Sequence, residues 1–255
     1  MGTINMNNFK SLIAALLLAP ALAVAAGGEV KLDRAPINPD DHASLQRGAR
    51  HFVNYCQTCH SASYMRYNRL QDIGLTDAQI RDNLIFTGVK VGDVMKAAMD
   101  PKASKEWFGA TPPELSVIAR SRASHAGSGA DWLYTYLRSF YRDPERPTGW
   151  NNTVFPNVGM PHVLWELQGE QVLANVKVRA DGYEKSEHAL KLSGKGTTTP
   201  VEYDRMVADL VNFMVFMGEP GQATRKTLGV FVLAALGLLF VLAYALKKEY
   251  WKDVH

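Results

Sequence analysis

Cysteine is scarce in this sequence: Cys56 and Cys59 are the only two among 255 residues. A structural zinc site would need further ligands at finger spacing, and no second cysteine pair exists to supply them. A thioredoxin-like redox pair shares the C-x-x-C spacing but requires a βαβ context, which the sequence lacks. Both of these common classes of cysteine site are therefore disfavoured.

A surplus of charge is also missing from most of the chain. The net charge is +3, yet residues 27–224 hold 22 Lys and Arg against 23 Asp and Glu, a net charge of −1. The positive surplus thus lies near the two ends. A domain this close to neutral lacks the basic patch of a nucleic-acid-binding protein, so we expect no nucleic acid among its partners.

The two cysteines belong to a five-residue run, Cys56-Gln57-Thr58-Cys59-His60. The pattern C-x-x-C-H is typical of c-type haem attachment. Each thiol forms a thioether to one vinyl group of the same porphyrin, and the adjacent histidine lies under the iron as its proximal ligand. The sequence therefore predicts one covalently bound haem c, held by Cys56 and Cys59, with His60 bound to the metal.

The N-terminal segment has the pattern of a secretory signal peptide. A lysine precedes an apolar run from Leu12 to Val24, and alanines follow the run. The run is shorter than the ~20 residues that span a membrane, which favours cleavage over a retained helix. We therefore expect residues 1–26 to be a signal peptide and 27–224 to form an exported haem domain.

A second apolar run lies near the C-terminus. Leu228 to Leu246 contains 19 residues without a charge, about 28 Å as a helix and close to the ~30 Å hydrocarbon core of a bilayer. Lysines follow it, as the positive-inside rule requires of a cytoplasmic tail. We expect an anchor at 225–248 and a cytoplasmic tail at 249–255. The protein would then be single-pass in the inner membrane, with its haem domain on the periplasmic side.

Apolar residues at helical spacing predict a mostly helical domain around one haem. One helix, beginning after Pro39, leads into the haem motif, and its expected partner is a helix from Val201 to Met217. Gly48 lies inside the first helix, where it either allows close approach of the second or is a tolerated surface glycine. Further helices are expected at 76–86, 95–99, 114–122 and 131–141, a hairpin at 171–178 and 188–192, and an irregular loop at 142–162.

The iron needs a second axial ligand, unless that position stays open. The candidates are Met65, Met95, Met99, Met160, Met206, Met214 and His162. Met206 and Met214 lie on an apolar helical stripe, where methionine is more often core filler. Met160 lies in a Pro-rich loop that presents a thioether without having to satisfy a helix face, and Gly159 beside it allows close backbone approach. The residues alone favour Met160, with His162 second.

Four features occur together in this chain. They are a single C-x-x-C-H run after an N-terminal helix, the segment PPELSVIARSR at 112–122, the run from Phe155 to Pro161, and one C-terminal anchor with a basic tail. This combination resembles the cytochrome c1 family, the haem subunits of quinol–cytochrome c oxidoreductase (cytochrome bc1) complexes. The resemblance covers Gly27 to His255, and the chain departs from commoner family patterns where His162 follows Pro161.

The resemblance implies a mostly α, cytochrome c-like haem domain with insertions, plus one C-terminal transmembrane helix. It implies Met160 as the sixth iron ligand and a charge-assisted contact from Arg120 to a haem propionate. The implied partners are a cytochrome b subunit, a Rieske iron–sulfur protein that supplies electrons, a soluble or tethered cytochrome c that takes them, and membrane lipid. The chain itself would be a redox subunit without catalytic residues of its own.

Two other functions remain open from the sequence. A stand-alone membrane-anchored cytochrome c would carry electrons without a complex and would purify alone. A haem sensor or enzyme would have an open distal site and five-coordinate iron, which ligand-binding spectra detect.

Overall fold

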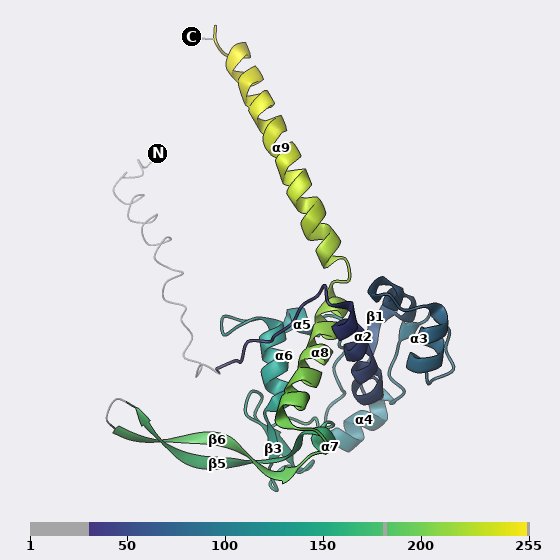
Figure 1. Cartoon of the computed structure of the whole chain (residues 1–255), viewed down its shortest axis with the longest axis vertical. Helices are drawn as coiled ribbons and strands as arrows, with labels where there is room; N and C mark the ends of the chain where they lie inside the picture. The colour runs from purple at the N-terminus through teal and green to yellow at the C-terminus, as the bar shows by residue number, and fades with distance from the viewer. Residues whose placement is uncertain (1–30, 181–182, 254–255) are drawn as a thin grey trace, which may run out of the picture. The chain divides into compact units, whose positions relative to one another are not determined.

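The structure is a computed structural model that describes residues 31–180 and 183–253. The expected signal peptide and the turn of the expected hairpin at 181–182 lie outside the described residues. The helices are α2 (His42–His51), η2 (Phe52–Cys56), η3 (Tyr67–Ile73), α3 (Asp77–Leu84), α4 (Pro101–Phe108), α5 (Ile118–Ser121), α6 (Gly129–Arg138), α7 (Trp165–Gln168), α8 (Pro200–Gly218) and α9 (Gln222–Tyr250). The strands are β1 (Ala62–Arg66), β2 (Val94–Met95), β3 (Phe140–Arg142), β4 (Trp150–Asn152), β5 (Gly169–Ala180) and β6 (Tyr183–Lys195). The mostly helical fold expected from the sequence is confirmed (Figure 1).

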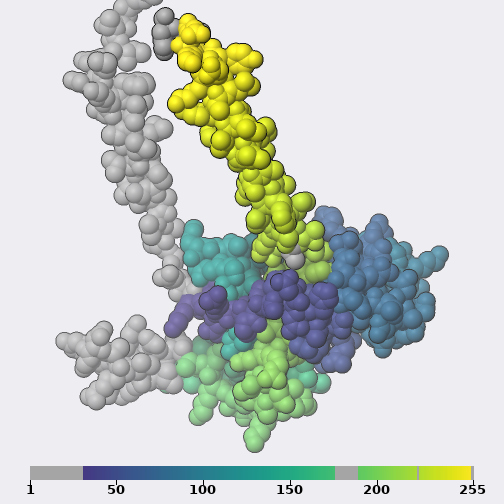
Figure 2. All heavy atoms as spheres, turned by 45° about the horizontal axis from the view of Figure 1, so that its top comes forward, coloured from purple at the N-terminus to yellow at the C-terminus, as the bar shows by residue number. Residues whose placement is uncertain are grey.

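Helices α2 and α8 pack against each other at the centre of the domain. They lie side by side in Figure 1, and Figure 2 shows the purple residues of α2 resting against the green of α8. At Gly48, an added Cβ atom would lie 2.1 Å from the Asp209 carbonyl oxygen and 2.7 Å from the Phe213 Cβ. The close helix approach considered for Gly48 is therefore confirmed, and only a glycine fits at this point of the contact.

A buried carboxylate joins the same two helices. Asp209 of α8 accepts hydrogen bonds from the Ser44 hydroxyl at 2.7 Å and from Arg47 Nε at 2.6 Å. The bond to Asp209 raises the pKa of Arg47, so the guanidinium stays charged. Because both partners on α2 bond to it, the carboxylate is compensated where burial would otherwise destabilise it.

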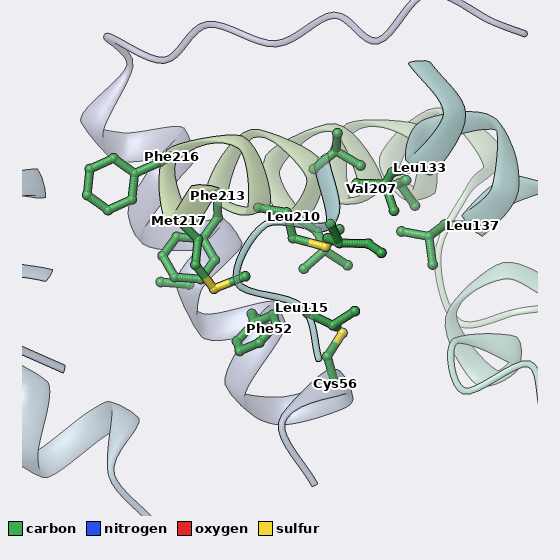
Figure 3. Packing of buried hydrophobic residues seen from close by; sticks show 14 of the residues in the cluster. Phe52, Cys56, Leu115, Leu133, Leu137, Val207, Leu210, Phe213, Phe216 and Met217 are labelled. Atoms are coloured by element: carbon green, nitrogen blue, oxygen red, sulfur yellow. The ribbon is translucent and has the colours of Figure 1, made fainter. Parts of the chain in front are cut away.

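The apolar core is built on α8. Thr199 caps the first turn of this helix, because its side chain accepts a hydrogen bond from the Glu202 N–H. The Glu202 side chain in turn accepts one from the Thr199 N–H, which completes a capping box. Figure 3 shows side chains of α8, including Leu210, facing Phe52 of η2 and Leu133 of α6. All three of these apolar side chains are buried. The helix that carries the haem motif is therefore fixed from one side by α8.

Within residues 31–180 and 183–253 the strands form three antiparallel pairs, β1–β2, β3–β4 and β5–β6. The helix expected at 95–99 is wrong, because Met95 lies in β2 and pairs with Ala62 of β1. The helix expected at 114–122 is also too long, since only Ile118–Ser121 is helical. The predicted hairpin is confirmed, and β5 and β6 pair along their whole lengths.

Helix α9 contains the predicted anchor. The part of α9 from Thr224 to Tyr250 contains a window with a mean hydropathy of 2.6, and none of the described residues of this window is buried. The 27 residues of this part extend about 40 Å at about 1.5 Å per residue, which exceeds the ~30 Å hydrocarbon core. The uncharged part, 228–246, therefore fits the bilayer, and the basic residues at both ends fit its interfaces.

We expect Gly48→Ala to destabilise the domain by at least ~1–3 kcal/mol, because the added methyl group overlaps the backbone of α8. The matched control is Gly92→Ala, since an added Cβ at the exposed Gly92 meets nothing within 4 Å. Thermal unfolding followed by circular dichroism should show a lower Tm for Gly48→Ala alone. Equal Tm values for the two variants would contradict the tight helix contact.

Candidate functional site

The predicted attachment motif forms a tight turn at the end of η2. The backbone N–H groups of Cys59 and His60 both donate to the Cys56 carbonyl, at 3.1 Å and 2.9 Å. The two cysteines are not bonded to each other, and burial raises the pKa of the Cys56 thiol to about 12. Redox-active cysteine pairs have lowered thiol pKa values. The environment of Cys56 therefore disfavours a thiol–disulfide function.

His60 is oriented by the segment that follows α4. Its Nδ1 atom lies 2.7 Å from the Pro113 carbonyl oxygen, which can only accept a hydrogen bond. The proton is thus on Nδ1, and Nε2 keeps its lone pair for a metal. Burial lowers the pKa of His60, which favours the neutral imidazole that metals bind. The orientation and the protonation of His60 both suit an iron ligand.

The segment 112–116 holds this turn in place through further bonds. The Leu115 N–H donates to the Ser61 carbonyl at 2.8 Å, and Glu114 Oε1 accepts from the Ser63 N–H at 2.7 Å. The Leu115 N–H and the Glu114 carboxylate are thus both bonded to residues that follow the turn, and the helix begins only at Ile118. The PPELS sequence therefore acts as a strap beside the C-x-x-C-H turn.

A cavity of about 270 Å³ opens beside this turn. Cys56, His60 and Met160 line it together. Its other walls are mostly apolar or aromatic and include Phe108, Pro112, Leu115, Ile118, Trp132, Leu133, Tyr136, Leu137, Phe155, Val158 and Met214. Figure 3 shows Cys56 and Leu115 facing the apolar side chains of α6 and α8. One thiol, one imidazole and the thioethers of Met160 and Met214 line an apolar cavity, with a second thiol in the same turn. This donor set fits a covalently attached haem.

The loop that carries Met160 is shaped by two buried asparagines of β4. Asn152 Oδ1 accepts from the N–H groups of Val154 and Phe155, at 2.9 Å and 3.2 Å. Asn151 Oδ1 accepts from the Asn157 N–H at 2.8 Å. The asparagine side chains thus accept hydrogen bonds from backbone N–H groups of the loop, in place of the carbonyl groups of a paired strand. These bonds fix the conformation of the loop. Sequence reasoning missed these asparagines, because they read as ordinary members of an irregular loop.

His162, the second candidate for the sixth ligand, has other partners. Its ring stacks on Phe140 at 4.8 Å with an interplanar angle of 2°, and its Nε2 lies 2.7 Å from Gln168 Oε1. Burial lowers the pKa of His162 to about 4, so it is a neutral packed ring. Among the described residues, the cavity wall contains Met160 but not His162.

The two arginines of the PPELSVIARSR segment lie in different places. The side chain of Arg120 is 66% exposed and lies 3.9 Å from Glu219. Arg122 lines the cavity, with its guanidinium 4.6 Å from the centre of the Trp132 ring. In the part of the chain that the structure describes, Arg122 but not Arg120 belongs to the cavity wall. The propionate contact of Arg120 stays a prediction, and Arg122 is a better-placed residue that the sequence reasoning missed.

A sequence model described as the Cytochrome C1 family matches residues 34–175 and 194–254, most of the chain. The chain belongs to the cytochrome c1 family. The gap between the two matched parts, residues 176–193, falls within the β5–β6 hairpin. The family resemblance seen in the motifs is therefore confirmed over the haem domain and the anchor.

Curated relatives extend the match over nearly the full length. "Ammonia monooxygenase gamma subunit" of Nitrosomonas europaea is 53% identical over 98% of this chain and 100% of its own length. "Cytochrome c1" of Allochromatium vinosum is 49% identical over 94% of this chain and 96% of its own. The mitochondrial "Cytochrome c1, heme protein" of Kluyveromyces lactis is 23% identical over 100% of this chain and 86% of its own.

Membership of the cytochrome c1 family establishes the cofactor and the general role. The chain carries one covalently attached haem c, and it has a single C-x-x-C-H run to hold it. It is a haem-bearing electron-transfer subunit of the cytochrome bc1 complex, anchored by a single C-terminal helix.

Proposed function

We propose that this chain accepts single electrons from a Rieske iron–sulfur protein and passes them to a soluble or tethered cytochrome c. The observation that carries the proposal is the donor set of the cavity, which is lined by the His60 imidazole, the Met160 thioether and Cys56. Haem c supplies a one-electron couple when bound. His60 and Met160 would both hold the iron, which would leave no open coordination position for a gas or a substrate.

The residues of the site have separate roles in this proposal. Cys56 and Cys59 attach the porphyrin, and His60 binds the iron through Nε2 because Pro113 holds Nδ1. Met160 would supply the second protein ligand, and a methionine ligand would raise the haem potential relative to histidine. The mostly apolar walls favour an apolar porphyrin over water in the cavity. A high potential suits an acceptor late in a quinol-oxidising chain, while quinol oxidation itself takes place on the cytochrome b subunit.

We expect Arg122→Gln to lower the haem potential more than Arg120→Gln does. The Arg122 guanidinium in the cavity wall would stabilise the reduced iron and could pair with a propionate, whereas the exposed Arg120 guanidinium is screened by water. The loss for Arg122→Gln should be on the order of 1 kcal/mol, a factor of about five in the reduction equilibrium. Redox titration of both variants measures it. A larger shift for Arg120→Gln would restore the assignment taken from the family resemblance.

We place the haem domain on the periplasmic side of the inner membrane and residues 249–255 in the cytoplasm. The basic residues after the anchor and the expected signal peptide support this topology. Protease added to cells with a permeabilised outer envelope should degrade the haem domain and spare a C-terminal epitope. The reverse pattern would contradict the topology.

The proposed function is tested by purification of the native protein after mild solubilisation. We expect it to copurify with a b-type cytochrome and a Rieske protein, in a fraction that transfers electrons from quinol to cytochrome c. A lone and fully active haem protein would instead indicate a free tethered carrier. Five-coordinate iron that binds carbon monoxide readily would indicate a sensor or enzyme.

A second candidate function comes from one relative. The Nitrosomonas europaea protein, 53% identical, is named as a gamma subunit of ammonia monooxygenase. By that analogy the chain would belong to a monooxygenase assembly. The same purification distinguishes the two, because the copurifying subunits would be those of a monooxygenase and not a b-type cytochrome with a Rieske protein.

A further inference from the structure

The sulfur atom of Met160 has a hydrogen-bond donor on the neighbouring helix. The Tyr136 hydroxyl of α6 lies 3.4 Å from Met160 Sδ and donates to it. A thioether sulfur accepts hydrogen bonds weakly. It has two lone pairs, so it can bind a metal with one and accept a hydrogen bond with the other. Both Tyr136 and Met160 line the cavity.

The ring of Tyr136 is fixed by its aromatic neighbours. It stacks on Trp132 at 4.7 Å with an interplanar angle of 13°, and it meets the Phe140 ring edge-on at 5.1 Å. The side chain is also buried, with 8% of its surface exposed. These contacts on both sides hold the hydroxyl in one direction, toward the sulfur atom.

The backbone of Tyr136 is tied to the loop that carries Met160. The fully buried Asn152 donates from Nδ2 to the Tyr136 carbonyl at 2.8 Å, while its Oδ1 accepts from the first N–H groups of the loop. Phe140, which contacts Tyr136, also stacks on His162, two residues after Met160. The phenol and the sulfur are thus held relative to each other by Asn152 on one side of the loop and His162 on the other.

We propose that Tyr136 is a positioning residue that raises the haem potential by donating its hydroxyl hydrogen to Met160 Sδ. The inference rests on the proposed role of Met160 as the sixth ligand. A hydrogen bond to the sulfur withdraws electron density from it, which weakens its donation to iron. Ferric iron depends on that donation more than ferrous iron does, so the bond favours the reduced state. The fixed donor also keeps the thioether at the site.

The test is Tyr136→Phe in the full-length haem-loaded protein. Phenylalanine keeps the ring that packs on Trp132 and Phe140 and removes only the donor. We expect the equilibrium constant for reduction to fall several-fold, by up to about tenfold, which is ~59 mV for a one-electron couple. The weak sulfur-to-iron absorption at about 695 nm should remain, because Met160 is still present.

The matched control is Tyr134→Phe. Tyr134 is a buried tyrosine of the same helix, and its ring packs under the Arg138 guanidinium at 4.4 Å. Its variant should keep the wild-type potential.

Two results would overturn the proposal while the absorption band at about 695 nm shows that the ligand is intact. One is a wild-type haem potential in Tyr136→Phe. The other is a fall in potential in Tyr134→Phe as large as that in Tyr136→Phe. Absence of that band from the wild-type protein would instead refute Met160 as the ligand, and the inference with it.

Discussion

Replacing both Cys56 and Cys59 with alanine is expected to abolish covalently bound haem. The two thiols are the only cysteines in the chain, so no other side chain can form a thioether to the porphyrin. A denaturing gel stained for haem peroxidase activity should show a band for the wild type and none for the double variant. The protein itself should still be detected by an antibody to a C-terminal tag.

The control for this prediction is Thr58→Ala, which changes a residue between the cysteines and keeps the C-x-x-C-H pattern. It should retain the haem stain. A stain that persists in the double cysteine variant would show that haem is attached elsewhere and would remove the basis of the site.

Replacing Met160 with leucine is expected to remove the sulfur-to-iron absorption at about 695 nm and to lower the haem potential. Leucine has nearly the volume of methionine, so the loop should still fold. Transfer from quinol to cytochrome c should fall to background in a complex that still assembles, because the haem no longer has the potential to accept the electron.

A second methionine of the same cavity makes a sharp control. Met214 of α8 also lines the cavity and is buried. Met214→Leu should keep the absorption band and the potential, because α8 packs this side chain into the core. Loss of the band in Met214→Leu, with the band kept in Met160→Leu, would assign the sixth position to α8 and contradict the account.

Sequence reasoning succeeded where the chemistry is local. The C-x-x-C-H run is complete within five residues, and the charge-free run at 228–246 reads as an anchor without knowledge of its neighbours. For Gly48 the sequence leaves two interpretations open, a close helix contact or a tolerated surface glycine. The short distances to Asp209 and Phe213 show that it is the close helix contact. Met160 was favoured by the composition of its loop, although its place in the cavity depends on residues far along the chain.

The predictions from the sequence are wrong or incomplete where the structure depends on contacts between residues far apart in the chain. Met95 is in a strand because Ala62 lies opposite, and nothing near Met95 indicates this. The helix α4 begins with the Asp100 cap and Pro101 at its first turn, a local signal that was overlooked. The family resemblance implies Arg120 as the propionate contact, whereas Arg122 lines the cavity. Helix α5 has only four residues, so its sequence shows no periodicity that indicates which arginine faces the cavity.

The central claim is that electrons reach this haem from quinol through a Rieske protein. The most direct test is anaerobic stopped-flow addition of quinol to the purified complex, with reduction of haem c followed by its visible absorption. The account predicts rapid reduction of haem c in the intact complex and loss of that reduction when the Rieske protein is removed. Reduction at an unchanged rate without the Rieske protein would contradict it.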